Sequence, residues 1–275
     1  MPDLTPDAAQ RPPAPFAGRR ILVVGATGVL GAPVVRALVA AGRTVFGTSR
    51  RVERFDDIER AGATGVRLDV LDPASIERAL AVARPDAIVF VATDLAGLDY
   101  AANARLRLEG APALVAAARA AGVERFVAES IAWAPDDEPV AALERAVTAH
   151  PHGVVLRFGL LYGPGTWYAA DGAFTALAGE GRVDAIAETT NWLHVEDAVS
   201  ATVAALDWPA GIVDVVDDEP AELDDWAGVL ARRAGFDDRP AVSARGPGRV
   251  ADAATAKSLG WRPSHSSWRD GLGLG

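Results

Sequence analysis

The glycine-rich stretch 20–31, RILVVGATGVLG, constrains the fold of this chain more than any other feature. Four apolar residues lead into Gly25, and Gly28 and Gly31 follow at intervals of three before an apolar pattern typical of a helix. This order predicts a buried strand, a tight turn and a helix whose free N–H groups attract a phosphate. Gly25 permits the turn, Gly28 lets a pyrophosphate approach the backbone, and Gly31 lets the helix pack against the strand. The stretch therefore predicts a dinucleotide site.

The end of the second predicted strand, 44–48, indicates which nicotinamide cofactor binds. Ser49, Arg50 and Arg51 follow this strand, and no carboxylate does. An acidic residue here would bind the ribose hydroxyl of NAD, whereas hydroxyls and an arginine accommodate the 2′-phosphate of NADP. The strand end therefore favours NADP(H), with two solvated surface arginines as the alternative. The cofactor residues expected from the turns and strand ends are Gly25, Thr27, Gly28, Val29, Leu30, Gly31, Thr48, Ser49, Arg50, Arg51, Asp69, Val70, Ala92 and Thr93.

The first half of the chain alternates strands and helices. This alternation predicts an α/β fold, a Rossmann-type doubly wound parallel sheet with helices on both faces. Ligands of such sheets lie beyond the carboxyl ends of the strands, where Thr93 and Asp94 follow the fourth strand. The further predicted strands are 65–70, 86–92, 123–129 and 153–158, and the further predicted helices are one that starts at Asp72 and Pro73, 100–121 and 138–149.

Beyond residue 171 the alternation loosens, which predicts a smaller C-terminal α/β substrate subdomain. Its expected elements are helices at 172–178, 195–206 and 223–234 and a strand at 212–216. The predicted organisation is a disordered N-terminal tail at 1–18, an NADP-binding Rossmann body at 19–160, and a region at 161–275 that is mainly substrate-binding cap, with some segments returning to the body.

Composition excludes several classes of function. The net charge of −10 argues against nucleic acid as a partner, because binding to phosphate backbones needs a basic surface. The chain has no cysteine, and its four histidines have no metal-ligand spacing, so we expect no metal. The apolar stretch 21–42 is interrupted by glycines, Pro33 and Arg36, which argues against a membrane span. We expect a cytoplasmic protein with a small-molecule substrate; its oligomeric state stays open.

Five sequence blocks resemble those of extended short-chain dehydrogenase/reductases, the superfamily that includes nucleotide-sugar epimerases and dehydratases. The resemblance implies a Rossmann fold, a nicotinamide lined by Phe158, Gly159 and Leu160, and a structural role for Asp197. It also implies a structural role for His194 before a helix, with catalysis as the alternative. It does not specify the reaction, because this fold hosts many functions. The blocks are GATGVLG at 25–31, AAGVERFV at 120–127, LRFGLLYGPG at 156–165, HVEDAV at 194–199 and LGWRP at 259–263.

The chain departs from this family where protons are handled. Oxidising and reducing members use a tyrosine with a lysine four residues later, but Lys257 is the only lysine here and no tyrosine precedes it at that spacing. Aligning the helix at 142–147 with the family puts Asp136 in the tyrosine position and Val140 in the lysine position. The usual proton-transfer pair is therefore absent.

Two further family positions are changed. The serine or threonine that members carry after the fifth strand corresponds to Ile131 or Ala132, and Ser130 stands just before it. The asparagine usual in the preceding long helix corresponds to Arg107. By position, Ser130 and Tyr162 are the nearest candidates for a catalytic hydroxyl.

Aromatic residues in the loops at the strand ends predict a pocket for a flat hydrophobic substrate. The alternative is ordinary packing between body and cap. The glycines around 162–171 would let this loop close as a lid, with the segment around Trp192 completing the pocket mouth. The expected substrate-binding residues are Asp94, Trp133, Thr166, Trp167, Tyr168 and Trp192.

Two functions remain compatible with this sequence. The first is an NADPH-dependent ketoreductase, acting on a hydrophobic, aromatic, polyketide-like ketone, as in antibiotic biosynthesis. A substrate phenol beside the carbonyl would then supply the proton in place of the tyrosine and lysine. The second is an NADP-binding sensor or scaffold without catalysis. An epimerase or dehydratase is disfavoured, because those reactions also need the missing tyrosine.

Overall fold

The computed structural model describes residues 16–95 and 99–272. Most of the predicted disordered tail, residues 1–15, lies outside the described residues. The prediction was wrong for its last residues, because the Phe16 ring is buried in the hydrophobic core with 4% of its surface exposed. Its backbone N–H donates to Asp207 at 2.6 Å, and the Arg43 and Arg125 guanidinium groups lie over the ring.

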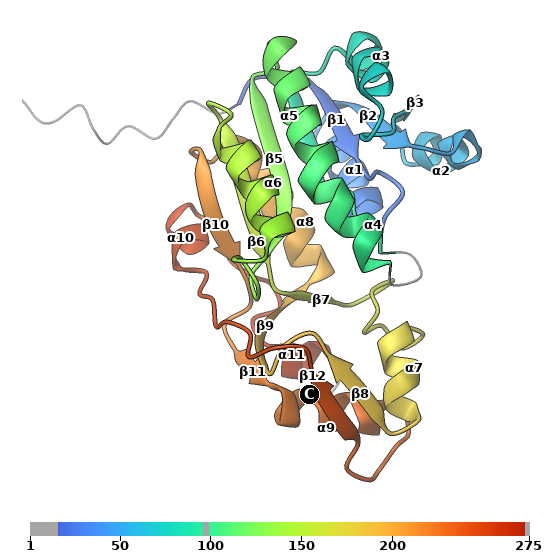
Figure 1. The fold of residues 1–275 in the computed structure, drawn as a ribbon, viewed down its shortest axis with the longest axis vertical. Coiled ribbons are helices and arrows are strands. Elements are labelled where there is room, and N and C mark those ends of the chain that lie inside the picture. Colours follow the sequence, from blue (N-terminus) through green and yellow to red (C-terminus); the bar gives the residue numbers. More distant parts are fainter. Residues whose placement is uncertain (1–15, 96–98, 273–275) are drawn as a thin grey trace, which may run out of the picture.

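The main sheet has seven strands, and every neighbouring pair is parallel. The second and third strands of the chain lie on one side of the first strand, and the fourth and later strands of this sheet lie on its other side. The switch point therefore lies between β1 and β4. This order confirms the predicted Rossmann-type sheet. From edge to edge the strands are β10 (Gly211–Val215), β6 (Gly153–Phe158), β5 (Arg125–Ile131), β4 (Ala87–Phe90), β1 (Arg20–Val24), β2 (Thr44–Ser49) and β3 (Thr64–Arg67) (Figure 1).

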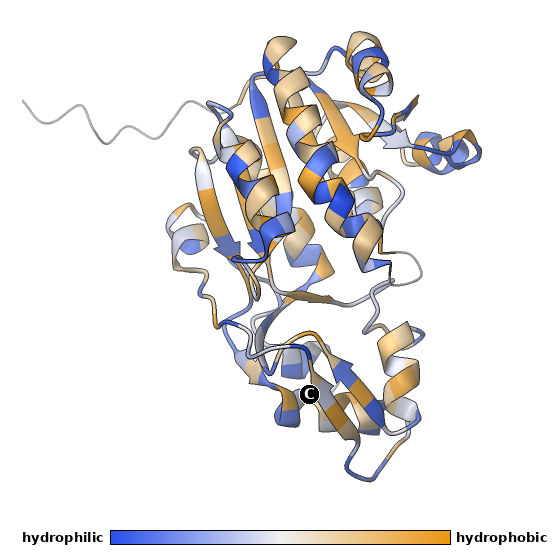
Figure 2. Cartoon of the chain, viewed as in Figure 1, coloured by the Kyte–Doolittle hydropathy of each residue, from blue (hydrophilic) through white to orange (hydrophobic). Residues whose placement is uncertain are grey.

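Helices cover both faces of this sheet, as the near-continuous apolar character of its strands requires. In Figure 2 the central strands are largely orange, whereas the helices mix orange and blue. One face is covered by α1 (Gly31–Ala40), α2 (Phe55–Arg60), α8 (Val195–Ala204) and α10 (Ala254–Ser258), and the other by α3 (Pro73–Ala83), α5 (Ala111–Ala120) and α6 (Glu138–Thr148).

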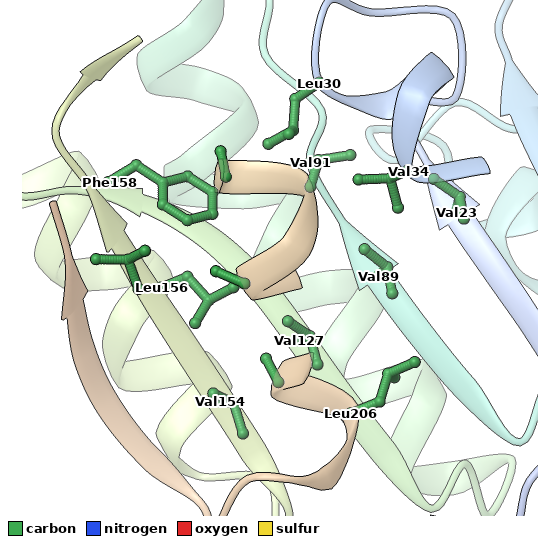
Figure 3. Packing of buried hydrophobic residues seen from close by; sticks show 14 of the residues in the cluster. Val23, Leu30, Val34, Val89, Val91, Val127, Val154, Leu156, Phe158 and Leu206 are labelled. Atoms are coloured by element: carbon green, nitrogen blue, oxygen red, sulfur yellow. The ribbon is translucent and has the colours of Figure 1, made fainter. Parts of the chain in front are cut away.

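The core on the α1 and α8 face reaches the carboxyl ends of the strands. Val89, Val127 and Leu156 come from three adjacent strands and are at most 1% exposed. They belong to one cluster with Val34 of α1 and with Leu206, which lies in the short helix η5 (Ala205–Asp207) after α8 (Figure 3). This close packing fixes the strand ends that position the site.

The cap lies below the main sheet in Figure 1 and has its own aromatic core. Tyr168 and Trp226 each lie edge-on to Trp192, with ring centroids 4.6 and 5.2 Å away. The cap elements are β7 (Leu160–Tyr162), α7 (Ala173–Gly179), β8 (Arg182–Ala185), β9 (Thr189–His194), β11 (Pro220–Glu222), α9 (Leu223–Arg233), β12 (Ala241–Ala244) and α11 (Trp268–Gly271).

Two segments from the region 161–275 pack with the Rossmann body and not with the cap. Strand β10 lies at one edge of the main sheet beside β6, and α8 packs against α1. Within the cap, β7 pairs in parallel with β9, and β8 in parallel with β12. Strand β7 lies where a loop was expected at 159–172, because pairing with the distant β9 supplies hydrogen bonds that the local sequence does not reveal.

The long helix expected at 100–121 is present but contains a π-helical turn. It runs as α4 (Tyr100–Arg105), the turn η4 (Leu106–Gly110) and then α5. Pro112 near the start of α5 lacks the N–H that would continue the ordinary helical bonding, which accounts for the irregular turn before it. The turn carries Arg107, whose surface is only 5% exposed. Among the described residues, no helix combines the length and apolarity that crossing a bilayer demands.

Candidate functional site

The glycine turn follows β1 at the carboxyl edge of the main sheet. Gly25 has a φ of +91°, and a Cβ there would lie 2.7 Å from the Ala92 backbone. A Cβ on Gly31 would lie 2.0 Å from the Gly25 carbonyl oxygen. Both positions therefore require glycine, and the turn leaves the first N–H groups of α1 facing out of the sheet. These features fit a nicotinamide dinucleotide, whose pyrophosphate the turn would hold.

Side chains that follow β2 and β4 meet, although β1 lies between these two strands in the sheet. Thr48 is buried, and the Ser49 hydroxyl accepts a hydrogen bond from the Arg51 N–H at 3.1 Å. The Arg50 guanidinium makes two hydrogen bonds to the Asp94 carboxylate, at 2.9 and 3.2 Å. Both side chains retain solvent contact, so an incoming phosphate could replace this carboxylate.

A cavity of about 710 Å³ lies between the carboxyl ends of the strands and the cap. Its volume is in the range of sites that hold a small molecule. The body contributes Val29 from the glycine turn and Thr93 after β4, and the cap contributes the segment 245–248 after β12. Val29 is 47% exposed although apolar, as expected of a residue that a ligand would cover.

Several predicted site residues come together at this cavity. From the predicted cofactor set these are Val29, Thr93, Phe158, Gly159 and Leu160, and from the predicted catalytic and substrate sets they are Ser130, Trp133, Thr166, Trp167 and Tyr168. The remaining predicted cofactor residues lie outside the cavity lining, at the turns and strand ends described above or, for Asp69 and Val70, just after β3.

Three predicted site residues lie elsewhere. Asp94 binds Arg50 instead of facing the cavity. Trp192 in β9 is fully buried in the cap core, which corrects its expected place at the pocket mouth. Tyr162 in β7 is fully buried as well; its ring lies 6.1 Å from Trp192, and its hydroxyl points to the Ser267 carbonyl at 3.4 Å. The hydrophobic effect favours burial of both rings, so they pack into the cap core and do not line a pocket.

Ser130 belongs to a buried polar network behind the cavity. Its hydroxyl donates to Glu144 of α6 at 2.7 Å, and Arg157 of β6 donates to both oxygens of the same carboxylate, at 2.8 and 2.5 Å. These bonds leave Glu144 charge-paired and hold the Ser130 hydroxyl in one orientation. The Ser130 hydroxyl therefore lies at the cavity wall in a fixed orientation, with its proton donated to the Glu144 carboxylate.

One group of potential metal ligands is present in the described part of the chain. Ligand atoms of His194, Glu196 and His265 lie within 4.8 Å of one another. His194 Nδ1 accepts the Glu196 N–H at 3.3 Å and so caps α8, and His265 Nδ1 contacts the Asp197 carboxylate at 3.0 Å. Asp197 also accepts the N–H groups of Ser264 and His265. These bonds give the residues structural roles, which agrees with the sequence-based reading of His194 and Asp197.

Comparison with known proteins places this geometry in a family. Residues 21–154 match the model of the NAD dependent epimerase/dehydratase family. A 3-diazoavenalumate denitrifying reductase from Streptomyces is 39% identical over 92% of this chain and 99% of its own length. The chain belongs to the NAD-dependent epimerase/dehydratase family. The family and this relative together support a reductase role with a nicotinamide cofactor.

Other relatives of this family member are more distant. The photosystem II assembly factor Ycf39 of Cyanophora paradoxa is 28% identical over 68% of the chain and 56% of its own length. The UDP-glucose 4-epimerase of Thermotoga maritima, solved with UDP-glucose, superposes with a TM-score of 0.73 at 21% identity over 92% of this chain and 96% of that one. The Thermus thermophilus epimerase, solved with NAD, gives 0.72 at 23% identity over the same shares. At these identities the solved structures establish the fold.

Charged residues that the sequence analysis did not assign to the site also line the epimerase/dehydratase-family cavity, and two of them come from the strand end and the long helix. Arg107 of the π-helical turn and Glu129 of β5 both line it. Burial raises the pKa of Glu129 to about 7, against a smaller opposing effect of the Arg107 charge. The change from asparagine at position 107 was visible in the sequence, but nothing local marked Glu129 among the apolar residues of its strand. Only the strand end and the helix meeting in space bring the two together.

Proposed function

We propose that this chain is an NADPH-dependent reductase that replaces the diazo group of a small aromatic acid with hydrogen and releases N2. The observation that carries the proposal is the 39% identity, over nearly the full length of both chains, to a 3-diazoavenalumate denitrifying reductase. The absence of the tyrosine and lysine pair supports it. A family site without that pair suits a reaction that leaves no alkoxide on the reduced carbon.

The electron balance explains why such a reaction does not need the usual pair. When bound, the reduced nicotinamide supplies a hydride. At a carbon that bears a diazonium group, the hydride forms a C–H bond, the C–N bond breaks, and N2 leaves with that electron pair. No negative oxygen develops at the carbon that takes the hydride, whereas ketone reduction creates one that must be protonated.

The cavity walls suit an aromatic acid. Trp133, Trp167 and Tyr168 provide flat apolar surface, and Phe158 with Leu160 closes the side next to the sheet. Arg245 brings a guanidinium to the cap side, where it lies 4.2 Å above the ring of Tyr100. We propose that Arg245 binds the substrate carboxylate, because a guanidinium matches the two oxygens of that group.

NADP(H) is the proposed cofactor. Support comes from the end of β2, where Ser49 and Arg50 stand without a carboxylate of the same strand. The exposed Arg50 guanidinium would exchange Asp94 for the more highly charged 2′-phosphate. Calorimetric titration with NADPH and NADH tests this part, and equal affinities would contradict it.

The experiment for the reaction uses the purified chain, NADPH deuterated at the reactive carbon, and an aromatic diazo acid labelled with ¹⁵N. We expect ¹⁵N2 in the gas phase and one deuterium in the product at the former diazo carbon, in equal amounts. Heat-inactivated protein controls for spontaneous loss of N2, which places no deuterium in the product. Gas release without deuterium transfer would contradict the proposal.

Reduction of an aromatic ketone is a second candidate, favoured by the oriented Ser130 hydroxyl and the aromatic walls of the same cavity. A substrate phenol beside the carbonyl would then deliver the proton. NADPH oxidation with a ketone library, compared with the same ketones methylated on that phenol, tests it. Oxidation that is unchanged by methylation would contradict the substrate-assisted route. NADPH binding without turnover of either class would favour the sensor or scaffold hypothesis.

A further inference from the structure

The carboxyl end of β5 places an acidic side chain where the site needs a proton. Glu129 is followed by Ser130 and Ile131, and all three line the cavity beside Phe158 and Gly159, the segment expected at the nicotinamide. Glu129 is only partly exposed. A substrate that lies against the cofactor would therefore also contact an acid at this position.

The neighbourhood of Glu129 is unusual for a buried carboxyl group. Burial and the charge of Arg107 are the two causes of its pKa shift, and no hydrogen bond is among them. In the described part of the chain no ion pair joins Glu129 to Arg107, although both line the same cavity. A carboxylate that has lost much of its hydration is costly unless a polar group meets it. A polar atom of a bound substrate would provide that partner.

Two of the other charged groups around this point, Glu144 and Arg157, are bound to each other. Glu144 is bound by Ser130 and Arg157, and its charge acts on Arg107 together with those of Glu129 and Asp137. The charged groups that line the cavity or lie directly behind it are Arg107 from η4, Asp137 before α6, Glu144 on α6, Arg157 on β6 and Arg245 after β12. Of these, Arg107 is the one whose charge acts on the pKa of Glu129.

We propose that Glu129 is the proton donor of this cavity and delivers its proton to a substrate oxygen that is conjugated with the carbon accepting the hydride. In a ketone, that oxygen becomes the alcohol as the C–H bond forms. In a neutral diazo compound conjugated with a ring oxygen, protonation of the oxygen turns the diazo group into a diazonium. The hydride then forms the C–H bond, and N2 leaves with the C–N electron pair.

Without a neighbouring lysine, a carboxylic acid suits this task better than a tyrosine, whose ordinary pKa is about 10. Proton transfer is most efficient when the pKa of the donor lies near the working pH, and Glu129 meets that condition with a value of about 7. Arg107 stabilises the carboxylate that remains after the transfer. Water that enters through the open side of the cavity returns the proton. The proposal rests on the proposed function only in requiring a substrate that accepts a hydride.

The first test compares Glu129→Gln with Asp136→Asn, using turnover of the best diazo acid or ketone. Glu129→Gln keeps the shape of the side chain but cannot donate its proton, so we expect turnover to fall by about 10²- to 10⁴-fold. NADPH affinity, measured by fluorescence titration, should stay within about threefold. Asp136 is exposed, lies outside the cavity lining, and occupies the family's tyrosine position, so its variant should match the parent protein.

The second test supplies a substrate that needs no proton. An arenediazonium cation without a conjugated oxygen already carries the positive charge, so Glu129→Gln should reduce it as fast as the parent protein does. An equal loss of turnover on this cation and on the oxygen-bearing substrate would overturn the proposal, since it would indicate a binding or structural role. If the parent protein reduces ketones but no diazo compound, the proposed reaction fails while the ketone arm still tests Glu129.

The third test needs neither cofactor nor turnover. Carbon-13 labelling of glutamate carboxyl groups lets NMR follow their titration in the free protein. We expect one signal that titrates near pH 7 and is missing from Glu129→Gln. Buried Asp217, whose pKa burial raises to about 8, does not interfere, because it carries no label. Titration of the Glu129 signal near the ordinary value of 4.5 would overturn the proposal.

Discussion

The carboxyl ends of β1 and β5 lie on the same edge of one sheet, yet they relate to the family in opposite ways. The turn after β1 keeps the glycines that a dinucleotide requires, with backbone approaches that no side chain can enter. The end of β5 has Glu129, Ser130 and Ile131, and the tyrosine and lysine that normally act with it are absent. Hydride delivery and proton handling are therefore separable parts of this site, and the second can change while the first stays fixed.

Substitution in the glycine turn should give the largest effect. Gly31→Ala would place its Cβ 2.0 Å from a backbone oxygen, so the turn must shift. Such overpacking costs about 1 to 3 kcal/mol, and at the upper end of this range we expect NADPH affinity to fall by about 10²-fold in a fluorescence titration. Gly228→Ala in α9 is the matched control, because its Cβ meets only the flexible end of Arg232. Equal losses in both variants would show that the turn is not special.

A substitution at the end of β5 should, by contrast, stabilise the folded protein. The pKa of Glu129 is raised above its unfolded value of 4.5. The cost in folding free energy of ionising this carboxyl group is therefore absent below pH 4.5, grows as the pH rises to about 7, and then stays constant. Glu129→Gln should therefore raise the free energy of unfolding at pH 8 by up to about 3 kcal/mol. Urea unfolding at pH 4 and pH 8 measures it. A variant that is no more stable at pH 8 would show that the carboxyl is well solvated.

The cofactor preference should depend on Arg50. Removing its guanidinium in Arg50→Ala removes a charge-assisted contact worth about 1.5 to 3 kcal/mol, so NADPH binding should weaken by about tenfold or more. Affinity for NADH, which lacks the phosphate, should not change. Arg54→Ala is the control, because Arg54 also pairs with an aspartate, Asp57, but lies in the helical turn beyond the strand end. Calorimetry with both cofactors tests the difference, and parallel losses for NADPH and NADH would contradict it.

The smallest effects are expected for the two hydroxyls first considered as catalytic. Tyr162→Phe removes only a long contact to Ser267 in the cap core, so turnover should change by less than about threefold. Ser130→Ala removes one of the bonds to Glu144 but leaves Arg157 in place, so turnover should fall by less than about 10²-fold. Steady-state kinetics on both variants checks this. Loss of all reduction in either one, with NADPH binding intact, would make that hydroxyl the acid.

The sequence could predict the cofactor half because its signals are local. An apolar run, a glycine turn and a helix pattern describe a strand, its turn and its helix within 20 residues, and parallel pairing then follows from the alternation. The cap was harder to predict. Strands β8, β11 and β12 each have three or four residues and pair only with distant segments, so no local pattern marked them.

For the candidate site, the sequence by itself determined which proton-transfer groups were missing, because a missing lysine is visible without coordinates. Only the tertiary structure decided which residues take their place around the cavity. Trp192 and Tyr162 turned inward to a core, whereas Arg107 reached the cavity from a π-helical turn and Glu129 from a strand end. The reason is physical: burial, and with it the pKa of a carboxyl group, depends on what distant segments place around it.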